Sequence, residues 1–201
     1  MQLLFRSCTA ASAVDLNPAG YAASEALCTT GTQQGGWGLL LSGVTYSQHA
    51  MLWNGSADTA VDLHPAGYTD SKITAINGTQ QVGEGWIGAQ GTYNSVRHAL
   101  TWNGTADTVL DLNQYLPAGY TNGVATGVDA SGNLYITEQG GLLLKWSPAD
   151  NSLTTLMSGL LNASGVAVDV AGNVYFSDSS TIRKLSPVNG TISTLWTYDV
   201  L

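Results

Sequence analysis

The chain has 201 residues, of which only 10% are charged, with a formal net charge of -8 and 24 glycines. Hydrophobic residues, at 44%, suffice for a sizeable core, and the many glycines favour turns over long helices. The six Lys and Arg residues are scattered, so the clustered cations that a nucleic-acid partner requires are missing. No apolar run reaches the roughly 18 residues of a membrane span, and we expect neither a nucleic-acid partner nor membrane insertion.

The first predicted element, over residues 1–16, is half of a repeat unit. Residues 3–16 (LLFRSCTAASAVDL) align without a gap to residues 50–63 (AMLWNGSADTAVDL), the second half of the unit that follows. We do not expect the opening MQLLFRSC to be a secretory signal peptide, because its apolar run is short and Arg6 interrupts it.

Two full units follow, over about 24–63 and 71–112. HAMLWNGSADTAVDL begins at His49, and a close copy, HALTWNGTADTVLDL, begins at His98. Alternation in the second unit predicts strands over 72–75, 82–89, 98–102 and 108–112. Asn77-Gly78 and Asn103-Gly104 fall between these strands, and Asn-Gly favours the positive φ angles of tight hairpin turns.

Two further units, over about 124–157 and 164–196, change the motif and keep the spacing. GVDASGNLYI begins at residue 127 and AVDVAGNVYF at residue 167. Repeats of roughly 40–50 residues are typical of four-stranded propeller blades, which bury their faces by stacking around an axis. We predict one all-β domain over 1–201, a β-propeller of four-stranded antiparallel blades with about four full blades and an N-terminal half blade.

Two families of repeats resemble these motifs. HAMLW and HALTW, each followed by DL, resemble the HAF-type repeats of bacterial extracellular proteins, over about residues 1–123. GVAVDVAGNVYFSDSSTIRKLSP resembles an NHL repeat, and this resemblance covers about residues 124–201. Both resemblances imply a β-propeller on an extracellular or cell-surface protein, and neither implies one activity.

The half blade leaves three alternatives open, since an unpaired sheet edge recruits partners. The chain is a fragment of a larger propeller, or closes as four blades with the N-terminal hairpin as a flap, or is completed by a second copy.

The repeated polar residues are predicted to be structural. His49 and His98 occupy one repeat position, which favours a hydrogen bond between strands, and His64 is expected in a solvated loop. Asp129 and Asp169 each precede a tight turn, where aspartate accepts backbone N–H groups. No motif predicts a catalytic residue, a metal site or a cofactor.

Aromatic residues give the one predicted binding site. Five tyrosines are expected on loops at one rim of the propeller, where an apolar ring with a polar tip suits glycan or protein contact: Tyr21, Tyr46, Tyr68, Tyr93 and Tyr120. The alternative is that the Ala-Gly-Tyr tyrosines seal the joints between blades. The tryptophans are expected in the inter-blade core, at positions 37, 53, 86, 102 and 146.

The sequence therefore predicts a non-enzymatic extracellular binding or scaffold module for a glycan or protein ligand. A second hypothesis is self-assembly of homo-oligomers or filaments through the half blade. A third is a propeller lyase or hydrolase, which requires a cluster of histidines and acids in the central channel.

Overall fold

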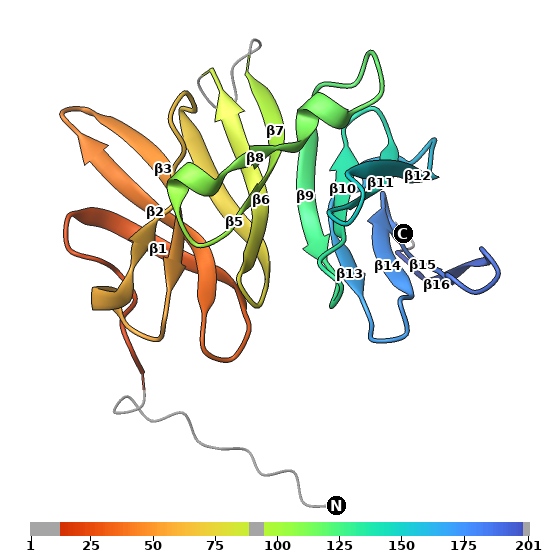
Figure 1. Ribbon diagram of the computed structural model, residues 1–201, viewed down its shortest axis with the longest axis horizontal. Coiled ribbons are helices and arrows are strands. Elements are labelled where there is room, and N and C mark those ends of the chain that lie inside the picture. The colour runs from red at the N-terminus through yellow and green to blue at the C-terminus, as the bar shows by residue number, and fades with distance from the viewer. Residues whose placement is uncertain (1–12, 89–94, 199–201) are drawn as a thin grey trace, which may run out of the picture.

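The computed structural model describes residues 13–88 and 95–198, which form four four-stranded antiparallel sheets (Figure 1). The predicted half blade over 1–16 lies almost entirely outside the described residues. The first blade contains β1 (Tyr21–Thr29), β2 (Gln34–Ser42), β3 (Thr45–Trp53) and β4 (Val61–Asp62), and the second contains β5 (Asp70–Asn77), β6 (Gln80–Ile87), β7 (Val96–Trp102) and β8 (Leu110–Asp111). The third blade contains β9 (Gly123–Val128), β10 (Leu134–Glu138), β11 (Leu142–Ser147) and β12 (Ser152–Met157). The fourth contains β13 (Val166–Val168), β14 (Val174–Asp178), β15 (Thr181–Leu185) and β16 (Ile192–Thr197). In every sheet the spatial order is the chain order, and the prediction of an all-β, propeller-like fold of four-stranded antiparallel blades is confirmed.

Short 3-10 helices are the only helical elements of the described residues: η2 (Ala57–Thr59), η3 (Ala106–Thr108) and η4 (Leu112–Tyr115). Helices η2 and η3 lie between the third and fourth strands of the first two blades, so Asn103-Gly104 opens a longer connection than the hairpin the sequence predicts. No helix in the described ranges is long and apolar enough to cross a membrane.

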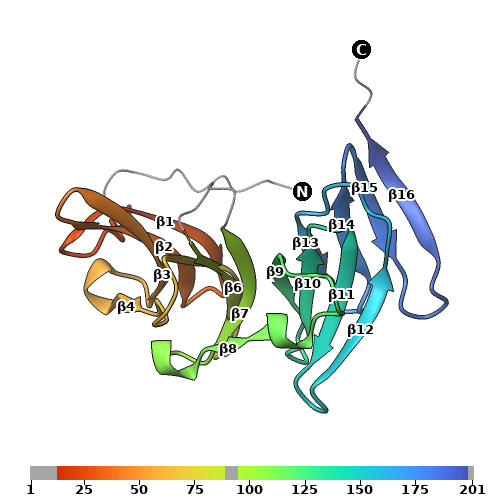
Figure 2. The ribbon, with the colours of Figure 1, turned by 90° about the horizontal axis from the view of Figure 1, so that it is seen from above.

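The blades stack in chain order through three apolar joints (Figure 2). The first joint contains Leu52 and Leu63 of the first blade against Ile73 and Trp102 of the second. The innermost strands also contact one another, β1 with β5, β5 with β9, and β9 with β13. Each sheet thus covers a face that it cannot bury within itself, which is the main source of stability for such a fold.

The tryptophans divide between two environments. Trp102 belongs to the first joint and Trp146 to the second, between blades two and three, as predicted. Trp53 is fully buried, whereas Trp37 and Trp86 are partly exposed. The prediction of inter-blade packing is therefore confirmed at two of the five positions.

The turns of the third and fourth blades use aspartate as expected. Asp129 Oδ1 accepts the backbone N–H groups of Ser131 and Asn133, both at 2.9 Å, and its Oδ2 accepts the Tyr135 hydroxyl at 3.2 Å. Asp169 repeats this pattern with its own turn. The prediction that these carboxylates accept backbone N–H groups is confirmed.

The first two blades contain a different repeated device, which we call the Tyr-Asp-His latch. In the second blade Tyr68 Oη donates to Asp111 Oδ2 at 3.0 Å, and His98 Nδ1 lies 2.6 Å from the same oxygen. In the first blade Tyr21, Asp62 and His49 make the same contacts, at 2.8 and 2.7 Å. The latch joins the innermost side of a blade to its third and fourth strands, which explains why the three residue types recur together.

A glycine beneath each tyrosine ring makes the latch possible. A Cβ atom added to Gly85 would lie 2.5 Å from Tyr68 Cδ1 and 2.6 Å from Leu100 Cδ1. Gly38 has the same relation to Tyr21, at 2.7 Å. The ring therefore crosses its own sheet over a residue without a side chain.

Replacing Gly85 with Ala should lower the free energy of unfolding by about 1–3 kcal/mol, because the added methyl group must displace Tyr68 or Leu100. Urea unfolding measures this loss. The control is Gly165→Ala, since the nearest atom to a Cβ there is 3.8 Å away. Equal stability of the two variants would contradict the close packing described here.

Candidate functional site: a polar pocket between the second and third blades

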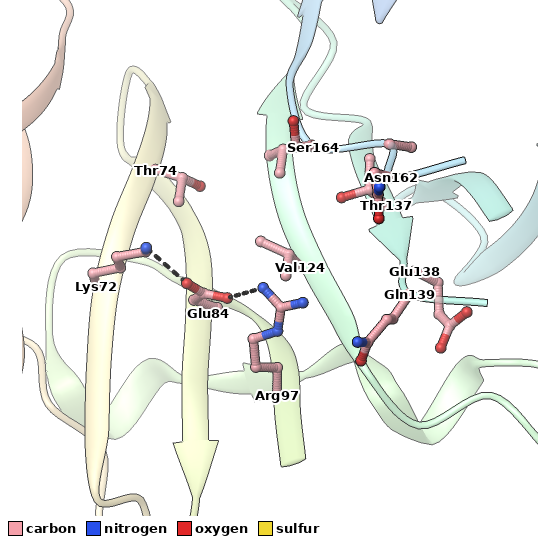
Figure 3. A pocket seen from close by; sticks show the side chains of 12 residues that line it. Lys72, Thr74, Glu84, Arg97, Val124, Thr137, Glu138, Gln139, Asn162 and Ser164 are labelled. Carbon is pink, nitrogen blue, oxygen red and sulfur yellow. Dashed lines mark ion pairs between the residues drawn. The ribbon is translucent and has the colours of Figure 1, made fainter. Parts of the chain in front are cut away.

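A pocket of about 360 Å³ opens between the inner strands of the second and third blades (Figure 3). Its residues come from β5, β6, β7, β9 and β10 and from the loop that precedes β13. The lining is Lys72, Thr74, Glu84, Arg97, Val124, Thr126, Thr137, Glu138, Gln139, Asn162, Ala163 and Ser164. Except for Val124 and Ala163 these are polar, which is unusual for a surface between stacked sheets.

Glu84 is the centre of one wall. Its side chain is only 3% exposed, and its Oε1 lies 2.8 Å from Lys72 Nζ. Lys72 and Glu84 are cross-strand partners on β5 and β6, so the sheet register brings them together. Arg97 Nη1 lies 3.7 Å from Glu84 Oε2, and Figure 3 shows the carboxylate between the two cations.

Arg97 is held from two sides. Its guanidinium stacks over the Trp86 ring, 5.3 Å from the ring centroid, which adds a cation–π contribution. Its backbone N–H donates to Asn122 Oδ1, and its carbonyl accepts from Asn113 Nδ2, both at 3.0 Å. The position of the cation is therefore fixed by the connection between the second and third blades.

Two buried oxygens of the pocket have no hydrogen-bond partner among the described residues: Glu84 Oε2 and Thr126 Oγ1. An unsatisfied buried polar group costs about 1–3 kcal/mol, and more if it is charged. Such groups in a native structure point to a ligand, an ion or an ordered water. Both oxygens can accept a hydrogen bond that no described residue donates.

Glu138 has a different task although it also lines the pocket. Its Oε2 accepts the backbone N–H of Gly140, and its Oε1 accepts the backbone N–H of Asn122 at 3.3 Å. Figure 3 shows this carboxylate directed away from Glu84 and Arg97. Glu138 therefore shapes the loops at the pocket's rim, and the two glutamates do not face one another.

Four of the five tyrosines of the predicted site lie within the described residues. Tyr21 and Tyr68 have their hydroxyls bonded within the latches, and burial together with the neighbouring Asp raises the pKa of both. Tyr46 is 60% exposed at the start of β3. Tyr120 packs against the second joint, and Tyr93 lies outside the described residues.

The latch tyrosine can be tested apart from any ligand. Tyr68→Phe should lower the free energy of unfolding by about 1–2 kcal/mol, because it removes the hydrogen bond that the hydroxyl donates to the Asp111 carboxylate. Denaturant unfolding gives this value. Tyr46→Phe, at an exposed position, is the matched control, and an equal effect of both changes would count against the latch.

The histidines lie away from the pocket. His49 and His98 bond to Asp62 and Asp111 of the neighbouring strand, so the predicted inter-strand hydrogen bond is confirmed. His64 is not in a solvated loop as expected. Its ring stacks on His49 with a centroid distance of 4.0 Å, and its nitrogens lie 2.8 Å from Ser71 Oγ and 3.1 Å from the Tyr68 carbonyl.

Sequence reasoning missed the pocket because its residues lie outside the conspicuous motifs. Lys72, Glu84 and Arg97 look like scattered charges along the chain. The available signal was Glu84 inside the strand segment QVGEGWI, where a carboxylate flanked by glycines is rarely buried without a partner. No group of three or more His, Cys, Asp or Glu side chains within the described residues could hold a metal ion.

No protein-family model matches the chain, and no curated protein matches it. The resemblance to HAF-type and NHL-type repeats therefore stays a prediction. Fold and site together define a propeller-like protein with a polar pocket near its axis.

Solved structures with a similar chain path include two from Bacteroides thetaiotaomicron. The extracellular domain of a one-component system is 14% identical, with a TM-score of 0.47, over 87% of this chain and 22% of that one. An auxiliary nutrient binding protein is 12% identical, with a TM-score of 0.47, over 90% of this chain and 42% of that one. A beta-fructofuranosidase of Bombyx mori in complex with sucrose is 10% identical, with a TM-score of 0.44, over 88% of this chain and 49% of that one.

This chain spans between about a fifth and a half of the length of those proteins. With TM-scores below 0.5, the likeness assigns no function to it.

The stacked histidines make stability depend on pH. Burial, and then the His49 ring, lower the pKa of His64 in the folded state, outweighing the Tyr68 carbonyl, Asp62 and Asp70, which raise it. The unfolded chain takes up a proton near the usual value of about 6.5. Between the two pKa values the unfolded state binds more protons, so stability falls as the pH decreases below about 6.5.

The equivalent positions of the neighbouring repeats hold Asn17 and Asn113. His64→Asn should therefore be tolerated, and it should remove the loss of stability that protonation of this histidine causes. Unfolding free energies measured from neutral pH downward test it. An internal control is the loss of stability below about pH 4. Burial raises the pKa of Asp62 and Asp111, but the hydrogen bonds from histidine, backbone N–H and tyrosine together outweigh it and lower the pKa of both. That loss should be present in both proteins, and parallel profiles over the whole range would disprove the role of His64.

Proposed function

We propose that this chain is a non-enzymatic binding module, and that its pocket between the second and third blades takes a polyhydroxylated group such as one sugar unit of a glycan. The observation that carries the proposal is the pair of buried oxygens that accept no hydrogen bond from a described residue, Glu84 Oε2, which has only the longer ion pair with Arg97, and Thr126 Oγ1. A carboxylate oxygen requires a donor, and a hydroxyl of a sugar is such a donor.

The rest of the lining supports a neutral, hydrogen-bonding ligand. Lys72 and Arg97 offer N–H donors, Glu84 lies between them, and with Glu138 the lining holds as many carboxylates as cations. A phosphate or carboxylate ligand would meet the Glu84 carboxylate as well. Hydroxyls, which donate and accept, match a wall that holds cations, a carboxylate, amides and threonine hydroxyls together.

The enzymatic alternative has less support. A hydrolase that cleaves glycosidic bonds generally uses two carboxyl groups flanking one bond, whereas Glu138 is bonded to two backbone N–H groups and directed away from Glu84. None of the three histidines is among the pocket residues. The proposal keeps the module outside the cell or at its surface, as the repeat resemblance implies.

A glycan array followed by calorimetric titration of the best ligand tests the proposal. Glu84→Gln should raise the dissociation constant by about tenfold or more, because a charged acceptor is lost. Arg97→Lys, which keeps the charge and loses the planar fork, should weaken binding as well.

The matched control is Glu25→Gln, an exposed carboxylate on β1 outside the pocket, which should bind as the parent protein does. Circular dichroism confirms that the variants fold. Absence of binding across the array, or equal affinity of the Glu84 and Glu25 variants, would refute the proposal.

A further inference from the structure

The fourth blade carries an apolar face that no described part of the chain covers. Four large side chains are exposed there: Ile182 at 43%, Leu195 at 54%, Trp196 at 53% and Tyr198 at 59%. We call them the open face. Ile182 and Trp196 are cross-strand partners on β15 and β16, and the Trp196 and Tyr198 rings lie 5.8 Å apart, so they form one patch. A contiguous apolar patch of this kind marks an interaction site more often than chance exposure.

The repeat shows what kind of surface the open face fits. Position 182 corresponds to Leu143 of the third blade, and 195 and 196 correspond to Leu156 and Met157, 39 residues earlier. Leu143 is fully buried, and Leu156 and Met157 pack in the third joint, against the fourth blade. The open face therefore has the residues of a blade joint, and its natural occupant is the inner side of another blade.

The described chain offers one such inner side outside its three joints, that of the first blade. Ala26 on β1 corresponds to Ile73 on β5, and each pairs with a glycine of the next strand, Gly36 and Gly83. Ile73 fills the first joint, whereas Ala26 is exposed. Met51 and Trp53 of the first blade are already buried, so the free part of this side is β1.

We propose that the open face docks against β1 of a second copy of this chain, so that two copies form one ring. Figure 2 shows the first and fourth blades at opposite ends of the row of sheets. In this ring each copy forms one half, and each fourth blade lies against the first blade of the partner. Both contacts then continue the joint that already links the third and fourth blades, and a twofold axis relates them.

Light scattering over a wide range of concentration, together with sedimentation velocity, tests the proposal on the full chain. The expected result is a mass of two copies that does not increase further. Trp196→Asp and Ala26→Asp should each give monomers, because each places a carboxylate in both joints. Val188→Asp, at an exposed loop position of the fourth blade, is the control and should remain a dimer.

Mixing the two disrupted variants distinguishes this arrangement from others. A mixed pair keeps one intact joint, between the fourth blade of the Ala26 variant and the first blade of the Trp196 variant, so association should reappear. Circular dichroism excludes unfolding as the cause of monomers. A monomeric parent protein, a dimer unaffected by Ala26→Asp (two fourth blades face to face), or a mass that rises beyond two copies would each overturn the proposed ring.

Discussion

The stacking of blades is the constraint on which the rest of this structure depends. A four-stranded meander has two faces and, alone, can bury neither, so every blade gains its stability from a neighbour. Leu52 and Leu63 of the first blade lie against Ile73 and Trp102 of the second, and the later joints are built in the same way. The row of sheets, the position of the pocket and the exposed patch on the last blade all follow from this dependence.

The two halves of the chain stabilise their blades by different networks of hydrogen bonds. The first two blades use tyrosine, aspartate and histidine around one carboxylate oxygen, with a glycine under the tyrosine ring. The third and fourth use an aspartate that ties its turn to a tyrosine. In both halves the carboxylate is satisfied by several donors, which is what allows a charged group to sit in a partly buried place.

In the pocket, one carboxylate is not fully satisfied. Glu84 is as buried as a core residue, yet its Oε2 has no hydrogen-bond partner among the described residues. The hydroxyl of Thr126, which lines the same pocket, also lacks one. Such atoms cost stability unless a water, an ion or a ligand satisfies them. The open face of the fourth blade is an apolar counterpart, because its exposed residues occupy the positions that are packed in the third joint.

The sequence by itself determined the blade. The repeated spacing, the Asn-Gly turns, the Gly-Asn turns at 132–133 and 172–173 and the alternation of apolar residues are local. They predict the four-stranded meander and its stacking without knowledge of long-range contacts. The recurring His49 and His98 could also be recognised as structural, because a residue repeated in each blade serves the blade.

Only the tertiary structure decided where the blades' polar residues meet. The register of β5, β6 and β7 places Lys72 opposite Glu84 and Arg97 diagonally across from it, since Arg97 pairs with Trp86. The hydrophobic pattern and the turns set this register, and a bulge in β5 shifts it. The tyrosines of the Ala-Gly-Tyr motif look alike in sequence, and Tyr68 and Tyr120 both pack against a joint. The hydroxyls of Tyr21 and Tyr68 also donate to an aspartate of their own blade. The latch partners lie 41 and 43 residues apart in the chain, and they meet because the strands of one blade fold back on one another. The sequence pattern alone does not contain the distance between such side chains.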